Sequence, residues 1–175
     1  MRLALFQPAI PQNVGAAIRL TACLGVELDV ILPCAFPLDD KAMKRAALDY
    51  GPLAHVTRHP AWADFLAAPS TQGRRLILFT TRGEPSFPNF DFQLADILLM
   101  GSENHGAPPH VHEAAAARLR IPIVAAARSL NLVTAAALAL GEALRQTGGY
   151  PGAGQPKVDT GFGARHAPSV LSREG

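Results

Sequence analysis

The chain has 175 residues, the size of a single domain, and 49% of them are hydrophobic, enough for a packed core. Only 17% are charged and the formal net charge is +2, which excludes a histone-like or polybasic protein but permits a local basic patch that binds nucleic acid. No apolar run is long enough to span a membrane and no signal peptide is visible, so we expect a cytoplasmic protein.

Strand-like and helix-like segments alternate in the first half of the chain. The expected elements are strands at residues 3–6 and 27–32, helices at 13–24, 39–48 and 60–68, and a short extended piece at 55–57. We expect Asn13 to cap the first helix, because its side-chain oxygen can accept a free backbone N–H. Proline in the first turn favours a helix start at residue 60.

The second half continues the alternation. The expected elements are strands at residues 76–80, 96–100 and 119–123, loops at 86–92, 101–106 and 125–128, and helices from 108 or 109 to about 117 and from Ser129, as the cap, to about 146. The apolar strands are nearly continuous rather than alternating. The sequence therefore predicts an α/β fold with a parallel sheet covered on both faces.

The last helical segment, residues 130–144, is apolar nearly all round. Such a helix is buried on more than one side, either in a homodimer contact or at the centre of the core. From residue 148 onward glycine, proline, serine and charged residues dominate, and apolar periodicity is absent. We expect one domain over residues 1–152 and a disordered or loosely packed tail over 153–175.

Three stretches could hold a ligand. Asn13 to Arg19 follows the first strand, and the guanidinium of Arg19 suits a phosphate or carboxylate; the alternative is a capped helix with a solvated arginine. The loop 101–106 follows a strand, is bounded by glycines and supplies Glu103. The transition from Ile121 to Asn131 places helix amides where an anion or polar group can bind.

Familiar chemical signatures are missing from the sequence. It has no glycine-rich nucleotide fingerprint, no phosphate loop and no nucleophile elbow. The six histidines are scattered, and the two cysteines, Cys23 and Cys34, form no C-x-x-C pair. We expect no metal, and we interpret both cysteines as buried thiols.

Taken together, the three stretches resemble the ordered motifs of one family. Asn13-x-Gly15-x-x-x-Arg19, Gly101-x-Glu103-x-x-Gly106, and Ile121-Pro122 followed by Ser129-x-Asn131-Leu132 are similar to the motifs of the SPOUT RNA 2′-O-methyltransferases. The chain most resembles the small tRNA (cytidine/uridine-2′-O)-methyltransferases that modify the wobble nucleotide, and the resemblance covers about residues 1–152. This chain has His105 and Val133 where those relatives commonly have arginine and serine.

The resemblance implies a five- or six-stranded parallel sheet whose C-terminal third forms a deep trefoil knot, a rare exception among folds. It also implies a homodimer and the cofactor S-adenosylmethionine. The residues that would line the cofactor pocket, by matching positions, are Leu78, Gly101, Glu103, Ile121, Ser129 and Leu130.

The implied reaction is methylation of a ribose 2′-hydroxyl in tRNA. We expect Arg19 to be the central residue, as a cation that binds the adjacent phosphate, with Asn13, Ser129 and Asn131 orienting Arg19 and the ribose. Contacts to the tRNA anticodon stem-loop are expected from Lys41, Lys44, Arg45, Arg58 and Tyr150. For the basic residues, the alternative is a solvated surface.

Two other functions stay open on the sequence alone. One is a non-catalytic RNA-binding relative, against which the retention of Asn13, Arg19, Glu103, Ser129 and Asn131 argues. The other is a ribosomal RNA 2′-O-methyltransferase. Such relatives often carry an additional N-terminal RNA-binding domain, whereas this sequence starts at the first strand, which favours tRNA.

Overall fold

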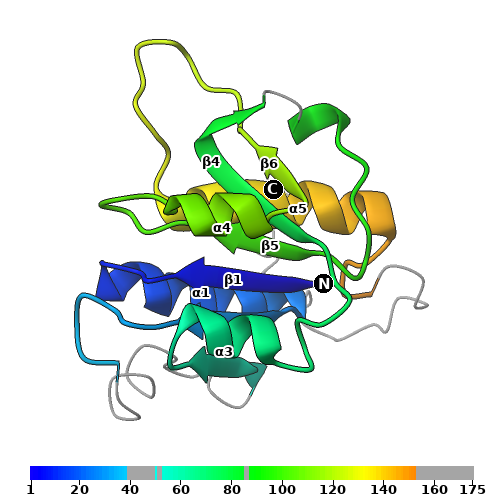
Figure 1. Ribbon diagram of the computed structural model, residues 1–175. Helices are drawn as coiled ribbons and strands as arrows, with labels where there is room; N and C mark the ends of the chain where they lie inside the picture. Colours follow the sequence, from blue (N-terminus) through cyan, green and yellow to red (C-terminus); the bar gives the residue numbers. More distant parts are fainter. Residues whose placement is uncertain (39–49, 51–52, 85–86, 153–175) are drawn as a thin grey trace, which may run out of the picture.

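The computed structural model describes residues 1–38, 50, 53–84 and 87–152. They form a parallel sheet with the strand order β3-β2-β1-β5-β4-β6 (Figure 1). The strands are β1 (Arg2–Phe6), β2 (Glu27–Ile31), β3 (Val56–His59), β4 (Leu76–Glu84), β5 (Ile97–Met100) and β6 (Ala117–Leu119). The predicted parallel sheet is confirmed, and it has six strands.

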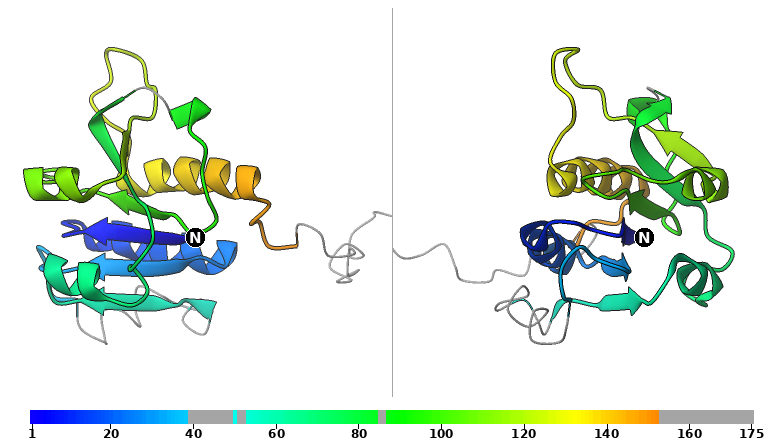
Figure 2. Two further views of the ribbon diagram at one scale, coloured as in Figure 1. Left: turned by 45° about the vertical axis from the view of Figure 1, so that its right-hand side comes forward. Right: turned by 60° about the vertical axis from the view of Figure 1, so that its left-hand side comes forward.

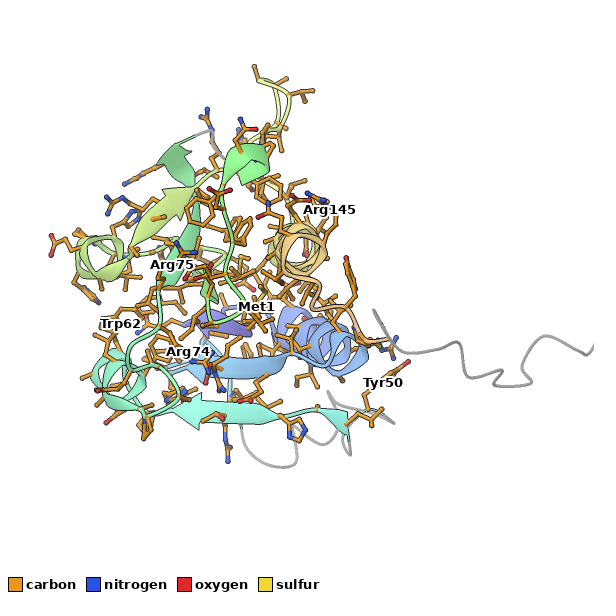
Figure 3. The ribbon with its side chains drawn as sticks, turned by 90° about the vertical axis from the view of Figure 1, so that its right-hand side faces the viewer. Met1, Tyr50, Trp62, Arg74, Arg75 and Arg145 are labelled. Carbon is orange, nitrogen blue, oxygen red and sulfur yellow. The ribbon has the colours of Figure 1, made fainter. Side chains whose placement is uncertain are left out.

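Helices cover both faces of the sheet. The long helices α1 (Pro11–Leu24) and α5 (Leu132–Thr147) lie on one face, and the short helices α3 (Trp62–Ala67) and α4 (Pro109–Ala114) lie on the other. Figure 2 shows the two layers from the side, and Figure 3 shows the helices almost end-on in pairs. One turn of 3₁₀ helix, η2 (Phe87–Asn89), follows β4.

The core consists of two apolar layers because successive side chains of a strand point to opposite faces. In β1, Leu3 and Leu5 pack into the layer beneath α1 and α5, whereas Ala4 and Phe6 pack into the layer beneath α3 and α4. All five residues of β1 are buried. A central strand buried on both faces accounts for the continuous apolar run in the sequence.

The first helix starts earlier than predicted. Pro11 is the first residue of α1 and the extended Ile10 precedes it, so Asn13 lies inside the first turn and is not the cap. A proline at the first helical position has a suitable φ and no N–H to leave unsatisfied, and the residue before a proline avoids the helical conformation. The side chain of Asn13 is therefore available for a contact outside its own helix.

The last strand also differs from the prediction. β6 covers Ala117–Leu119 rather than 119–123, and α4 ends at Ala114 rather than near 117. These residues pair with β4, which extends to Glu84 instead of ending at residue 80. The tertiary pairing overrides the local pattern, and the stretch after Leu119 remains irregular up to α5.

Some predictions fall outside the described part of the chain. The expected helix at 39–48 and the tail at 153–175 are among them, so the tail and the boundary at residue 152 stay predictions. The knot also stays a prediction. In the described residues no helix is both long enough and apolar enough to cross a membrane.

Helix α5 is buried on one face only. Ala136, Ala139 and Leu140 are fully buried against the sheet and α1, whereas Leu138 is 47% exposed and Arg145 is exposed. Of the two alternatives for this helix, a fully enclosed central position is wrong. The exposed face of α5 carries Leu138, a large apolar side chain that a second molecule could cover.

A buried ionic network joins the first three strands. The carboxylate of Asp29 in β2 is fully buried and accepts hydrogen bonds from Arg2 Nε and Nη2 at 2.7 and 2.9 Å. His59 Nε2 of β3 lies 2.8 Å from Asp29 Oδ1, and Glu27 also pairs with Arg2. All of these side chains except that of Glu27 are nearly inaccessible to water. Arg2 and Asp29 therefore compensate each other's buried charge.

We predict that Asp29→Asn destabilises the fold by roughly 3 kcal/mol, because it leaves the buried guanidinium of Arg2 without its main counter-charge. The free energy of unfolding, measured with urea, tests this. Asp64→Asn is the matched control, since Asp64 is exposed in the first turn of α3 and its loss costs less than about 0.5 kcal/mol. Equal losses in the two variants would contradict the prediction.

Candidate functional site

A large cleft opens at the carboxyl edge of the sheet, beyond β4, β5 and β6. Its volume is about 810 Å³, within the range of sites that bind cofactors and other small molecules. The strand order reverses between β1 and β5, and open parallel sheets bind ligands beside such a switch point. The large cleft is therefore the candidate site.

The three sequence motifs meet around this cleft. They reach it from α1, from the loop after β5 and from the irregular stretch between β6 and α5. The predicted site residues that line it are Asn13, Gly101, Glu103, Ile121, Ser129, Leu130 and Asn131. Residues more than a hundred positions apart in the sequence thus share one wall.

Leu78 does not line the cleft, so its prediction as a pocket residue is wrong. Its side chain is fully buried in the layer beneath α3 and α4. Its neighbours Phe79, Thr80 and Thr81 line the cleft instead, because they lie farther along β4 toward the carboxyl edge. The resemblance identified the correct strand but the wrong position on it.

A chain of hydrogen bonds links the three motifs at the wall of the cleft. Glu103 Oε1 accepts from Asn13 Nδ2 at 2.8 Å, and Glu103 Oε2 accepts from the backbone N–H of Ala9 at 2.7 Å. Asn13 Oδ1 in turn accepts from Asn131 Nδ2 at 3.0 Å. A carboxylate can only accept hydrogen bonds, so the NH₂ group of Asn13 must face Glu103. The oxygen of Asn13 then faces Asn131 and fixes the orientation of the Asn131 amide.

Asn131, and not Ser129, caps helix α5. Its Oδ1 accepts from the backbone N–H groups of Val133 and Thr134 at 2.9 and 3.2 Å. One amide therefore satisfies two free donors of the helix and also donates to Asn13. Ser129 is exposed in the preceding loop, where it lines the cleft.

The packing of the loop after β5 requires a glycine at position 101. A Cβ on this residue would lie 2.7 Å from the backbone carbon of Gly106 and 2.9 Å from the nitrogen of Ala107. These contacts are closer than any side chain tolerates, so the loop closes only over a glycine. Gly101 also lines the cleft.

Arg19 lies away from the cleft of its own chain. It is exposed on α1, does not line the cleft, and its guanidinium lies 5.0 Å from the centre of the Tyr50 ring. Six residues of a helix turn through about 600°, so Arg19 and Asn13 point in directions about 120° apart. Within one chain Asn13 is bonded to Glu103 and Asn131 and not to Arg19, so the expected orientation of Arg19 by Asn13 stays a prediction.

Of the five residues expected to contact RNA, the structure describes Arg58 and Tyr150. Lys41, Lys44 and Arg45 lie outside the described residues. Arg58 is exposed and donates to the carbonyl of Leu38 at 2.9 Å. The hydroxyl of Tyr150 donates to the carbonyl of Gly141 on α5 at 3.1 Å, so Tyr150 lies along that helix.

Two cleft residues were missed by the sequence reasoning. Arg120 and Arg128 line the cleft, are exposed, and make no hydrogen bond or ion pair within the described parts of the chain. Arg120 directly precedes the stretch from Ile121 to Asn131 and Arg128 lies within it, so a cation in or beside this loop was the available signal. They give the cleft two guanidinium groups that can bind a carboxylate or a phosphate.

No group of three or more potential metal ligands occurs among the residues that the structure describes. Cys34 is half-buried, and burial followed by the nearby charge of Glu103 raises the pKa of its thiol to about 11. The thiol is protonated at neutral pH and is a poor nucleophile. Cys23 is exposed rather than buried, which corrects the expectation for that residue.

Comparison with known proteins identifies the family. Residues 1–141 match the model of the SpoU rRNA Methylase family. The chain belongs to this family. The resemblance drawn from the three motifs is thereby confirmed.

Two similar proteins match this chain over nearly the whole of their own length. A protein of Beijerinckia indica subsp. indica named "tRNA (cytidine(34)-2'-O)-methyltransferase" is 48% identical over 146 residues, covering 83% of this chain and 91% of the relative. A structure described as "Structural insights into the 2-OH methylation of C/U34 on tRNA" is 42% identical, with a TM-score of 0.76 and coverage of 83% and 94%.

A more distant structure has a bound cofactor. It is described as "Crystal Structure of AdoMet bound rRNA methyltransferase from Sinorhizobium meliloti", is 27% identical and has a TM-score of 0.72. The alignment covers 82% of this chain and 55% of that one. S-adenosylmethionine is thus found in a structure that shares this fold.

We predict that Glu103→Gln lowers the free energy of unfolding by roughly 1–3 kcal/mol. Two donors, the N–H of Ala9 and the amide of Asn13, face the carboxylate, and the NH₂ group of a glutamine would oppose one of them. Urea titration measures the change. Glu113→Gln, on the exposed side of α4, is the isosteric control and is expected to unfold like the wild type. Wild-type stability in Glu103→Gln would show that the carboxylate does not hold the motifs together.

Proposed function

We propose that this protein transfers a methyl group from S-adenosylmethionine to the ribose 2′-hydroxyl of the wobble nucleotide, cytidine or uridine at position 34, in tRNA. The observation that carries the proposal is the cleft of about 810 Å³ into which all three family motifs project. Support for the substrate comes from the relative and the structure that are 48% and 42% identical, whose descriptions name position 34 of tRNA.

The cleft has the chemical features needed to hold S-adenosylmethionine. Ile121 and Leu130 provide apolar surface for an adenine ring, and backbone groups around Gly101 provide hydrogen-bonding partners. Arg120 and Arg128 provide positive charge for the carboxylate of the amino-acid end. When bound, the cofactor supplies an electrophilic methyl group on a sulfonium.

The hydrogen-bonded side chains of Asn13, Glu103 and Asn131 form a polar wall of the cleft, and we assign to this wall the positioning of the substrate. Asn13 is 6% exposed and held on both sides by Glu103 and Asn131, so the wall is rigid before any substrate binds. Glu103 is a poor candidate for the general base because both of its oxygens already accept a hydrogen bond. We assign the proton of the 2′-hydroxyl to an oxygen of the adjacent phosphate, which Arg19 binds as a cation.

A second copy of the chain is needed to bring Arg19 to a cleft. Arg19 is exposed on α1 and outside its own cleft, while Leu138 is exposed on the neighbouring α5. We propose a homodimer through α1 and α5 in which Arg19 of one copy binds the phosphate at the other copy's cleft. The apolar surface of α5 and the position of Arg19 support the same interface.

A ribosomal RNA substrate is the second candidate, favoured by the description of the family model and of the structure with bound AdoMet. The identity to the tRNA enzymes, 48% and 42%, exceeds the 27% to that rRNA enzyme, which supports tRNA. An enzyme acting on tRNA works where tRNA is found, so the proposal includes a cytoplasmic location.

We predict that the purified protein methylates a transcript of tRNA at the ribose of nucleotide 34 when S-adenosylmethionine is present. Nucleoside mass spectrometry identifies the product and its position. A transcript with a 2′-deoxy nucleotide at position 34 is the matched control and accepts no methyl group. Transfer to the deoxy control, or to ribosomal RNA alone, would contradict the proposal.

We predict that two inactive variants complement each other. Arg19→Ala removes the cation, and Ser129→Trp fills the cleft from an exposed loop position. If Arg19 acts across the interface, a 1:1 co-refolded mixture regains about a quarter of the wild-type rate, because half of the dimers are mixed and have one intact site. Action within one chain gives no recovery.

The complementation has an interface control. Leu138→Glu places a charge on the exposed apolar face of α5 without disturbing the core, so it is expected to give a folded monomer. Introduced into both variants, it abolishes the recovery. Analytical ultracentrifugation reports the mass, and a wild-type monomer at micromolar concentration would contradict the dimer.

A further inference from the structure

A second, smaller cavity lies beside the large cleft at the same edge of the sheet. Its volume is about 340 Å³, and it lies beyond the ends of β1 and β2. Phe6, Gln7 and Cys34 form part of its wall, and Asn104 and His105 stand at its rim. None of the functions assigned above uses this small cavity.

A tight turn separates the small cavity from the large cleft. Ser102 and Gly106 exchange two backbone hydrogen bonds, of 3.0 and 2.8 Å, and both residues line both cavities. The turn is the loop after β5, next to the switch point of the sheet. A ligand in the small cavity is therefore one turn of backbone away from a ligand in the cleft.

The volumes of the two cavities limit the size of the ligand that each can hold. Ligand sites span about 300–1,000 Å³. The large cleft, at 810 Å³, accommodates a nucleoside with an amino-acid arm, and the small cavity, at 340 Å³, is near the lower limit. The small cavity suits a single-ring group such as a pyrimidine base.

The inner wall is apolar and held in place. Phe6 is 4% exposed and makes edge-to-face contacts with Trp62 and His110, at centroid distances of 5.7 and 6.3 Å. Figure 3 shows Trp62 on the side of α3 and α4. Phe6 reaches the small cavity only with its small exposed part, so it gives a base an apolar and fixed surface to lie against.

The wall and the rim of the small cavity supply hydrogen-bonding groups that have no other partner among the described residues. The side chains of Gln7, Asn104 and His105 make no hydrogen bond within the part of the chain that the structure describes. Amides and a neutral imidazole each offer a donor and an acceptor. These groups match the edge of a pyrimidine, whose donors and acceptors differ between cytidine and uridine.

The backbone at Gln7 is an independent sign of a ligand site. Gln7 has a φ of 46°, the left-handed conformation that residues other than glycine seldom adopt, and it is the one described non-glycine residue with a positive φ. Such strain is concentrated at sites that bind ligands. Here it occurs directly after β1, at the wall of the small cavity.

We propose that the small cavity binds the base of the nucleotide whose ribose is methylated, with Asn104 and His105 hydrogen-bonding to its Watson–Crick edge. This assignment rests on the proposed function. A base outside the stack, in the small cavity, leaves its ribose at the dividing turn and facing the large cleft. Both rim groups can donate and accept, so the cavity accepts cytidine and uridine alike.

The test compares the affinity for two RNAs that differ only in the target base. The probes are an anticodon stem-loop RNA with cytidine at position 34 and the same RNA with an abasic nucleotide there, titrated by fluorescence anisotropy. We expect the wild type to bind the cytidine RNA about tenfold more tightly than the abasic RNA, the contribution of one well-held base. The double variant Asn104→Ala/His105→Ala is expected to bind both RNAs with the affinity that the wild type has for the abasic RNA.

Two further variants sharpen the comparison. Ala35→Trp fills the small cavity from an exposed position and is expected to lose the same preference. His55→Ala/Gln72→Ala removes an imidazole and an amide that are exposed at the opposite edge of the sheet, before β3 and β4, and keeps the wild-type preference. The affinity for S-adenosylmethionine, by calorimetry, stays within twofold in all of them.

The outcomes separate this assignment from the function on which it rests. A wild type that does not distinguish the two RNAs, or a double variant that retains the preference, overturns the base assignment even if methyl transfer occurs. A tenfold loss of S-adenosylmethionine affinity in the double variant also overturns it, by making the cavity part of the cofactor site. A wild type without methyl transfer to any tRNA overturns the proposed function and the assignment together.

Discussion

The carboxylate of Glu103 is the group on which the arrangement of the site depends. It accepts from the backbone of Ala9 at 2.7 Å and from the amide of Asn13 at 2.8 Å, and so joins the loop after β5 to the start of α1. Asn13 extends the connection to the cap of α5. Three segments that are distant in sequence keep one geometry because each hydrogen bond determines the direction of the next.

The parallel sheet determines where this network can form. All strands run in the same direction, so every strand ends at the same edge, and the reversal of strand order between β1 and β5 leaves space there. The helices cover the two faces of the sheet (Figure 1), and the cleft lies at the carboxyl edge. Chemistry-bearing residues of this chain therefore collect at the loops of a single edge, while the strands contribute apolar packing.

Most of the fold could be predicted from the sequence. Continuous apolar runs indicated buried parallel strands, since β1 and β5 are buried along their whole length. The boundaries that failed depend on distant partners. β6 ends at Leu119 because its pairing with β4 is complete there, and no local pattern contains that information.

The sequence predicted which residues belong to the site but not how their side chains are arranged. Motif matching placed Asn13, Glu103 and Asn131 at one site, and they are bonded to one another. Which residue caps α5, which face of β4 meets the cleft and where Arg19 points are set by side-chain directions, which the motifs do not contain. Leu78 and Arg19 illustrate the limit, since each lies on the expected element and faces away from the cleft.

The turn between Ser102 and Gly106 has a thermodynamic consequence. It is a common wall of two cavities, so a displacement of the turn that enlarges one of them alters the other. Ligands that bind on its two sides are then coupled, and the factor by which the first changes the affinity of the second equals the factor in the reverse order. A wall of five residues is thus enough to couple the two ligands equally, whichever of them binds first.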